Sequence, residues 1–139
     1  TDLNRPIDPS ALPRFDRILL DAPCSGLGVL RRNPDAKWSA LKKDIAGFAR
    51  RQVRFLDRLA PLVKKRGTLV FAVCSMEPEE NESVITQFLK KHPNFAIGAV
   101  QATMDKFVLP FVGADGLFRT APHTHHMDGF FAARLTREY

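Results

Sequence analysis

Apolar residues along the chain follow two different periods, which predict strands and helices in alternation. Continuous apolar runs, typical of strands buried on both faces, predict strands over 15–20 and 68–73. Between them, apolar residues from Trp38 to Val63 recur at intervals of three and four, which predicts a helix over 37–63 with one buried stripe. A strand, a helix and a strand in this order predict a parallel pair joined by a right-handed crossover.

A shorter helix is predicted after the second strand. Pro78 suits the first turn of a helix that ends before His92-Pro93. Three carboxylates would complement the positive end of this helix, namely Glu79, Glu80 and Glu82.

Turn-forming residues punctuate the remaining chain. Residues 1–14 contain three prolines and read as an irregular lead-in, and 64–67 is predicted to end the long helix in a turn that closes on glycine. A mostly irregular segment is expected over 101–116. Further strands are expected over 95–100, 117–119 and 129–136. The alternation of the two periods predicts an α/β domain.

The composition is that of one globular domain without export or membrane signals. The chain has 139 residues, 45% of them hydrophobic, which suffices for a core. No apolar run approaches the ~20 residues of a membrane helix, so no membrane partner is expected. Two cysteines do not form a disulfide framework and are expected as reduced thiols in a cytoplasmic protein.

Positive charge is concentrated in one stretch of the sequence. The formal net charge is +6, but residues 31–66 alone hold twelve Lys or Arg against three Asp, and the remaining residues are net negative. A polyanion such as nucleic acid is therefore a candidate partner, and a solvated helix face without a partner is the alternative.

Two predicted strands each end shortly before a cysteine. Cys24 follows a strand that ends near Asp21, and Cys74 follows the next strand. Ligands of open α/β sheets bind at the carboxyl ends of strands, so both thiols are expected at one rim. Cys74 lies before a predicted helix start and Cys24 near Arg31 and Arg32, positions that lower a thiol pKa and favour a nucleophilic thiolate.

Other roles for the cysteines fit less well. A disulfide oxidoreductase usually has Cys-x-x-Cys, and a zinc deaminase needs Pro-Cys-x-x-Cys, which the residues after Pro23-Cys24 do not complete. His123, His125 and His126 could assist a thiol hydrolase or hold a metal, but a loop beside a binding surface is favoured, and no metal is expected. Small buried thiols without chemistry are the remaining alternative.

Four motifs occur in one order along the chain. They are Asp21-Ala-Pro-Cys-Ser-Gly26, Arg31-Arg-Asn-Pro-Asp35 with Lys37-Trp38, Cys74-Ser75 before Pro78-Glu-Glu-Asn-Glu82, and Asp128-Gly-Phe-Phe-Ala-Ala-Arg-Leu135. Together they resemble the C-terminal half of the catalytic domain of the Sun/Fmu-type RNA (cytosine-5) methyltransferases, most nearly the bacterial enzymes acting on small-subunit ribosomal RNA. The similarity covers nearly the whole chain from Phe15 onward.

The resemblance implies a catalytic role for three residues. Cys74 would attack carbon 6 of a cytosine, so that carbon 5 can take a methyl group from S-adenosyl-L-methionine. Cys24 would assist release of the covalent RNA adduct. Asp21 would contact the target base and lie near the methyl donor, as both a catalytic and a cofactor-binding residue.

The resemblance also implies an RNA-binding surface. Pro23 would shape the loop that aims Cys24. Arg31 and Arg32 begin the basic stretch that would hold phosphates of the RNA, which the resemblance implies is ribosomal RNA, beside a cytosine that has left its stack.

The implied fold is part of a Rossmann-like S-adenosylmethionine-dependent methyltransferase, with an antiparallel last strand. The glycine-rich turn and the acidic residue that a complete donor site needs do not occur in the sequence. We therefore expect residues 1–139 to be the C-terminal part of the catalytic domain, without its cofactor-binding first half and inactive alone. An unpaired sheet edge would then favour a homo-oligomer. The alternative is a non-catalytic RNA-binding or assembly module with the same fold.

Overall fold

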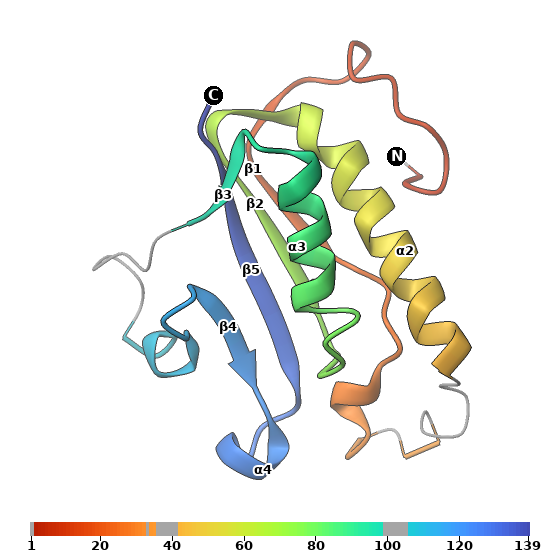
Figure 1. The fold of residues 1–139 in the computed structure, drawn as a ribbon, viewed down its shortest axis with the longest axis vertical. Helices are drawn as coiled ribbons and strands as arrows, with labels where there is room; N and C mark the ends of the chain where they lie inside the picture. The colour runs from red at the N-terminus through yellow and green to blue at the C-terminus, as the bar shows by residue number, and fades with distance from the viewer. Residues whose placement is uncertain (1, 33, 36–41, 99–105) are drawn as a thin grey trace.

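Five strands form one mixed sheet in a computed structural model that describes residues 2–32, 34–35, 42–98 and 106–139 (Figure 1). Four of the strands lie in the order β1-β2-β5-β3, and β4 also pairs with β5. The strands are β1 (Phe15–Asp21), β2 (Val63–Val73), β3 (Phe95–Ile97), β4 (Leu117–Thr120) and β5 (Phe130–Arg137).

The pairing directions follow the predicted topology. β1 and β2 are parallel and are joined by the long helix, whereas β5 runs antiparallel to β2, β3 and β4. β3 and β4 share the outer side of β5, β3 near its end and β4 near its start (Figure 1). The predicted α/β class, the parallel pair and the antiparallel last strand are confirmed.

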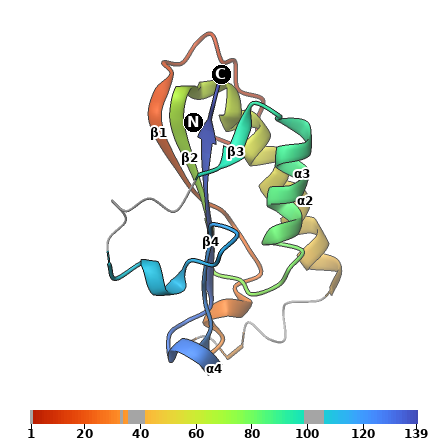
Figure 2. The same cartoon turned by 60° about the vertical axis from the view of Figure 1, so that its left-hand side comes forward.

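Helices α2 (Lys42–Leu59) and α3 (Glu82–Lys91) pack side by side and cover one face of the sheet (Figures 1 and 2). A single turn, α4 (Pro122–His125), joins β4 to β5. Fully buried side chains of β2, such as Leu69 and Phe71, belong to one hydrophobic core with Leu56 of α2 and Phe88 of α3. No helix in the described ranges is long and apolar enough to cross a membrane.

The long helix is shorter at its C-terminal end than the sequence predicts. α2 ends at Leu59, a 3-10 turn follows over Ala60–Leu62, and β2 begins at Val63. Pro61 cannot donate the backbone hydrogen bond that would continue the helix, and the fully buried Val63 enters the sheet instead. The predicted start of this helix at Lys37 lies outside the described residues.

The predicted turn over 64–67 is instead an irregular part of β2. Phe15 pairs with Val63 and Arg17 with Thr68, so β2 has three more residues than β1 between these pairs. Arg66 accommodates the excess with a φ of 62°, in the left-handed region. The strand prediction from Thr68 was therefore right in type but began five residues late.

The second helix begins later than predicted. α3 starts at Glu82, and Pro78 instead opens a turn in which its carbonyl accepts hydrogen bonds from the Asn81 and Ser83 amides. Glu80 is consequently a fully buried turn residue and not an exposed carboxylate at a helix end. Of the predicted strand over 95–100, β3 forms the first three residues, and 99–100 lie outside the described residues.

β1 is an exposed edge strand, contrary to the prediction that it is buried on both faces. Most of its side chains are exposed; Leu19 is 69% accessible, while Leu20 beside it is buried against the helices. Within the described residues, β1 has β2 as its one strand partner. A short apolar run cannot reveal by itself which of its faces is covered, because that depends on neighbouring elements.

Candidate active site

The thiols of Cys24 and Cys74 meet at the carboxyl end of the parallel strand pair. Their Sγ atoms lie 3.0 Å apart, within hydrogen-bond distance for sulfur, and both are free thiols and half-buried. Cys74 directly follows β2, and Cys24 lies three residues after β1. The parallel direction of these two strands brings both loops to the same edge of the sheet.

Backbone hydrogen bonds hold these loops against a third segment. The Gly28 amide donates to the Cys74 carbonyl over 3.0 Å, and the Gly129 amide donates to the Gly28 carbonyl over 2.7 Å. A Cβ atom on Gly28 would lie 2.0 Å from the Gly129 oxygen and 2.9 Å from the Cys74 carbonyl carbon. Glycine is required at position 28 because three backbones approach one another there.

A buried carboxylate joins the residues that follow the two cysteines. Glu80 is fully buried, and its Oε2 accepts hydrogen bonds from the Ser25 hydroxyl (2.5 Å) and the Ser75 hydroxyl (2.6 Å). Its Oε1 accepts from the Ser25 amide (2.9 Å) and from the Gln52 side chain (3.2 Å). Gln52 also donates to the Pro23 carbonyl over 3.0 Å.

Sequence reasoning missed the structural roles of Glu80, Gln52 and the two serines. The signal available was that a serine follows each cysteine and that three glutamates lie close together after Cys74. Nothing local to the sequence distinguishes Glu80 from the exposed Glu79 beside it.

The environment of Cys24 favours a protonated thiol. Burial, and the hydrogen bond with Cys74, raise the pKa of Cys24 from 9.0 to about 12. This result contradicts the expectation that nearby arginines lower the pKa of this thiol. Cys74 does not lie directly before a helix start as predicted, because α3 begins eight residues after it.

The two arginines expected at the substrate surface fasten the loop before β5. Arg31 donates to the His126 carbonyl over 3.3 Å. Arg32 forms a 2.8 Å ion pair with Asp128, whose carboxylate is only 8% exposed. The Arg32 side chain is itself 75% exposed, so it remains accessible to a ligand.

Asp21 and Pro23 both lie on the surface beside the thiols. Asp21 is the last residue of β1 and is exposed, and its carboxylate has no hydrogen-bond partner among the described residues. Pro23 is exposed immediately before Cys24. Four of the expected site residues therefore lie at or just after the carboxyl ends of β1 and β2: Asp21, Pro23, Cys24 and Cys74.

The three histidines do not join the thiols. His125 accepts a hydrogen bond at Nδ1 from the Ala121 amide and packs edge-on against Phe111, so its role is structural. His123 and His126 are exposed, and none of the three bonds to a thiol in the described ranges. The same ranges contain no group of three or more His, Cys, Asp or Glu that could hold a metal ion.

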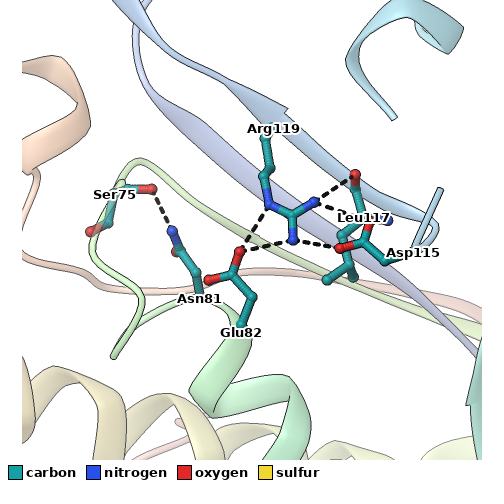
Figure 3. A network of polar contacts seen from close by, with 6 residues as sticks. All are labelled: Ser75, Asn81, Glu82, Asp115, Leu117 and Arg119. Carbon is teal, nitrogen blue, oxygen red and sulfur yellow. Dashed lines mark hydrogen bonds and ion pairs between the residues drawn. The ribbon is translucent and has the colours of Figure 1, made fainter. Parts of the chain in front are cut away.

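A charged network fixes the turn that carries Glu80 (Figure 3). Arg119 of β4 forms ion pairs with Glu82 (2.8 Å) and Asp115 (2.7 Å), which ties the start of α3 to the sheet. Asn81 donates to the Ser75 carbonyl over 3.2 Å. In Figure 3 these contacts extend from the loop after Cys74 to the turn before β4.

The described cations of the basic stretch are distributed over several elements. Arg50, Arg51 and Arg54 are exposed along α2, the helix that reaches the cysteine loops through Gln52. Lys64, in contrast, pairs with Asp16 near the start of β1, at the opposite end of the sheet.

Comparisons with known proteins match almost the whole chain. A family profile described as 16S rRNA methyltransferase RsmB/F matches residues 1–136. A probable ribosomal RNA small subunit methyltransferase B from Bacillus subtilis (strain 168) is 44% identical over 126 residues, which cover 90% of this chain and 28% of that protein. The ribosomal RNA small subunit methyltransferase B of Photorhabdus laumondii is 42% identical and is covered to 27%.

Solved structures show the same fold. NSun6 from Pyrococcus horikoshii, determined with SFG, matches with a TM-score of 0.76 and 29% identity, over 94% of this chain and 32% of that one. A methyltransferase homologue from Pyrococcus horikoshii matches with a TM-score of 0.68 and 31% identity, over 90% of this chain and 40% of that one. The chain thus spans under a third of the length of the curated relatives it matches, and its sheet is part of a Rossmann-like methyltransferase fold.

Proposed function

Because this chain belongs to the 16S rRNA methyltransferase RsmB/F family, we propose that its two cysteines carry out cytosine-5 methylation of ribosomal RNA. Cys74 is the nucleophile and Cys24 assists release of the product. The observation that carries the proposal is the 3.0 Å separation of two free thiols at the rim where an α/β sheet binds its ligands.

The chemistry requires one sulfur to form a bond and later to leave. The Cys74 thiolate adds to carbon 6 of a flipped cytosine, which breaks the double bond between carbons 5 and 6 and makes carbon 5 electron-rich. Carbon 5 would take the methyl group that S-adenosylmethionine supplies when bound, with S-adenosylhomocysteine as the leaving group. A base then takes the proton from carbon 5, and its electron pair restores the double bond as the carbon–sulfur bond breaks and the thiolate leaves.

The environment of Cys24 supports this division of roles. The raised pKa of Cys24, about 12, keeps its proton in place, so Cys24 can donate a hydrogen bond to a Cys74 thiolate. When the Cys74 sulfur is bonded to carbon, it no longer carries the negative charge that this hydrogen bond stabilises. Cys24 then becomes available to the adduct, as a role in its release requires.

Four residues near the thiols are proposed to face the RNA, namely Asp21, Pro23, Arg31 and Arg32. The Asp21 carboxylate is exposed and unpartnered within the described residues, so it can accept hydrogen bonds from a cytosine edge or from the methyl donor. The exposed guanidinium of Arg32 is suited to a phosphate beside the target base.

The described residues fit only part of a methyl-donor site. The family is S-adenosylmethionine-dependent, and SFG in the NSun6 structure is an analogue of that donor. Here, however, the Gly28 amide is already bonded to the Cys74 carbonyl, and Gly129 fills the space beside it, so this glycine pair cannot cradle a ligand. We therefore propose that residues 1–139 hold the base-attacking part of the site and are inactive alone.

Calorimetry with S-adenosylmethionine tests this division of the site. The 139-residue chain is expected to bind the donor far more weakly than the complete protein that carries it. Micromolar binding to the chain alone would contradict the proposal.

An RNA containing 5-fluorocytosine tests the reaction, because fluorine at carbon 5 cannot leave as a proton does and the covalent adduct persists. The complete protein should form an adduct that survives denaturation. Cys74→Ala should abolish it, whereas Cys24→Ala should retain it. If no variant forms an adduct although the RNA binds, the alternative of a non-catalytic RNA-binding module is favoured.

A further inference from the structure

The carboxylate of Glu80 accepts hydrogen bonds from both cysteine-bearing loops. It accepts two hydrogen bonds from Ser25, the residue after Cys24, and one from Ser75, the residue after Cys74. The fourth bond comes from Gln52 of α2, which in turn holds the carbonyl of Pro23. All three segments around the thiols therefore meet at one group.

Burying the Glu80 carboxylate costs free energy that burying a neutral side chain would not cost. A role that requires a charged group is therefore expected at this position. Glu80 is fully buried, and no Lys or Arg in the described ranges forms an ion pair with it. A buried charge without a counter-ion is tolerated only when several donors replace its water. Hydroxyl-to-carboxylate distances of 2.5 and 2.6 Å are short, as expected for charge-assisted hydrogen bonds.

The geometry points to Glu80 as the residue that sets the spacing of the two thiols. Each short hydrogen bond ends one residue away from a cysteine, so the carboxylate limits how far the two loops can separate. The two segments are otherwise linked near the sulfurs by the bond from the Gly28 amide to the Cys74 carbonyl, by the bond from the Ala22 amide to the Ala72 carbonyl, and by a 3.5 Å contact between the Ser25 and Ser75 hydroxyls. Glu80 adds the short, charge-assisted bonds among these links, so its loss should loosen the 3.0 Å sulfur separation.

The consequence for catalysis rests on the proposed function. If Cys74 attacks the base and Cys24 assists release, each thiol must reach the same cytosine, and small displacements of either sulfur slow the reaction. Glu80 is fully buried, so it is a positioning residue and does not touch the RNA. Its loss should lower kcat while the KM for RNA stays nearly unchanged.

A dithiol reagent measures the sulfur spacing without RNA or methyl donor. Phenylarsine oxide forms two arsenic–sulfur bonds, and its oxygen leaves as water with the two thiol protons. Two thiols already held 3.0 Å apart should bind it strongly at one arsenical per chain. Glu80→Gln lacks the charge that shortens the serine hydrogen bonds, and we expect about tenfold weaker binding.

Matched variants separate spacing from charge and from folding. Glu79→Gln removes the same charge from the exposed neighbouring residue and should bind the arsenical within about twofold of the wild type. Ser75→Ala keeps the carboxylate but removes one of its donors, and it should weaken binding in a chain whose far-ultraviolet circular dichroism is unchanged. Unchanged binding by both Glu80→Gln and Ser75→Ala, or no binding by the wild type, would overturn the inference.

The same variants in the complete protein distinguish this inference from the proposed function. A wild-type protein that binds the arsenical but forms no adduct with 5-fluorocytosine RNA would refute the proposed function and leave the spacing role of Glu80 intact. A wild type that forms the adduct, together with a Glu80→Gln variant of unchanged kcat and arsenical affinity, would refute the spacing role alone.

Discussion

Substituting Gly28 by alanine should destabilise the protein strongly, because this residue lies where three backbone segments meet. The added Cβ would lie 2.0 Å from the Gly129 oxygen, where ordinary contacts begin at 3.4 Å. Relief requires Gly129 and the Cys74 loop to move apart. That movement breaks or stretches the hydrogen bonds of 3.0 and 2.7 Å that Gly28 makes with Cys74 and Gly129.

The expected magnitude follows from these two losses. Forcing an extra carbon into a packed site costs about 1–3 kcal/mol, and each weakened backbone hydrogen bond adds about 1 kcal/mol. Gly28→Ala should therefore lower the free energy of unfolding by about 3–5 kcal/mol, a large share of the total stability of a typical domain. Urea denaturation, followed by circular dichroism, measures this change from the midpoint at constant slope.

Two other glycines provide controls for the same chemical change. Gly47 lies within α2 with no close neighbour for a Cβ, so Gly47→Ala should stabilise the protein by about 0.5–1 kcal/mol. Gly26 has open space but a φ of +74°, so Gly26→Ala should cost about 1–2 kcal/mol from backbone strain alone. A Gly28→Ala variant no less stable than Gly26→Ala would refute the argument from close approach.

Three further outcomes follow from the electrostatics and from the sheet edge. The free energy of unfolding should fall as the pH rises from about 9 to about 12, because the Cys24 thiol ionises near 9.0 in the unfolded chain but, with its pKa raised, only near 12 in the folded protein. A Cys24→Ser variant measured over the same pH range should lack this part of the decrease. Arg119→Met removes the ion pairs with Glu82 and Asp115, so it should lower the free energy of unfolding by about 1 kcal/mol in urea denaturation, and by less at high salt. An equal decrease at all salt concentrations would argue against an electrostatic cause. The exposed edge of β1 should associate into a dimer or larger assembly that Leu19→Lys weakens, and a monomer mass by light scattering at high concentration would contradict this.

The sequence alone was sufficient for the elements that have a clear period. The continuous apolar run after Gly67 predicted the part of β2 that fills the core, and the motif from Asp128 predicted β5 to within one residue at each end. The order strand, helix, strand was enough to predict the parallel pair. Because parallel strands end at the same edge, the sequence also predicted that Cys24 and Cys74 lie at one rim.

Only the tertiary structure decided which faces and charges are covered. β1 and β2 have similar apolar runs, yet β1 is an exposed edge, because burial depends on what packs against a strand and not on the strand itself. Glu79 and Glu80 are adjacent and identical in kind, but only Glu80 meets donors that lie 28 and 55 residues away in the sequence. The raised pKa of Cys24 has the same origin, since burial and a thiol 50 residues distant determine it. Interactions of this kind arise from contacts between distant segments, so they cannot be predicted from a local pattern of residues.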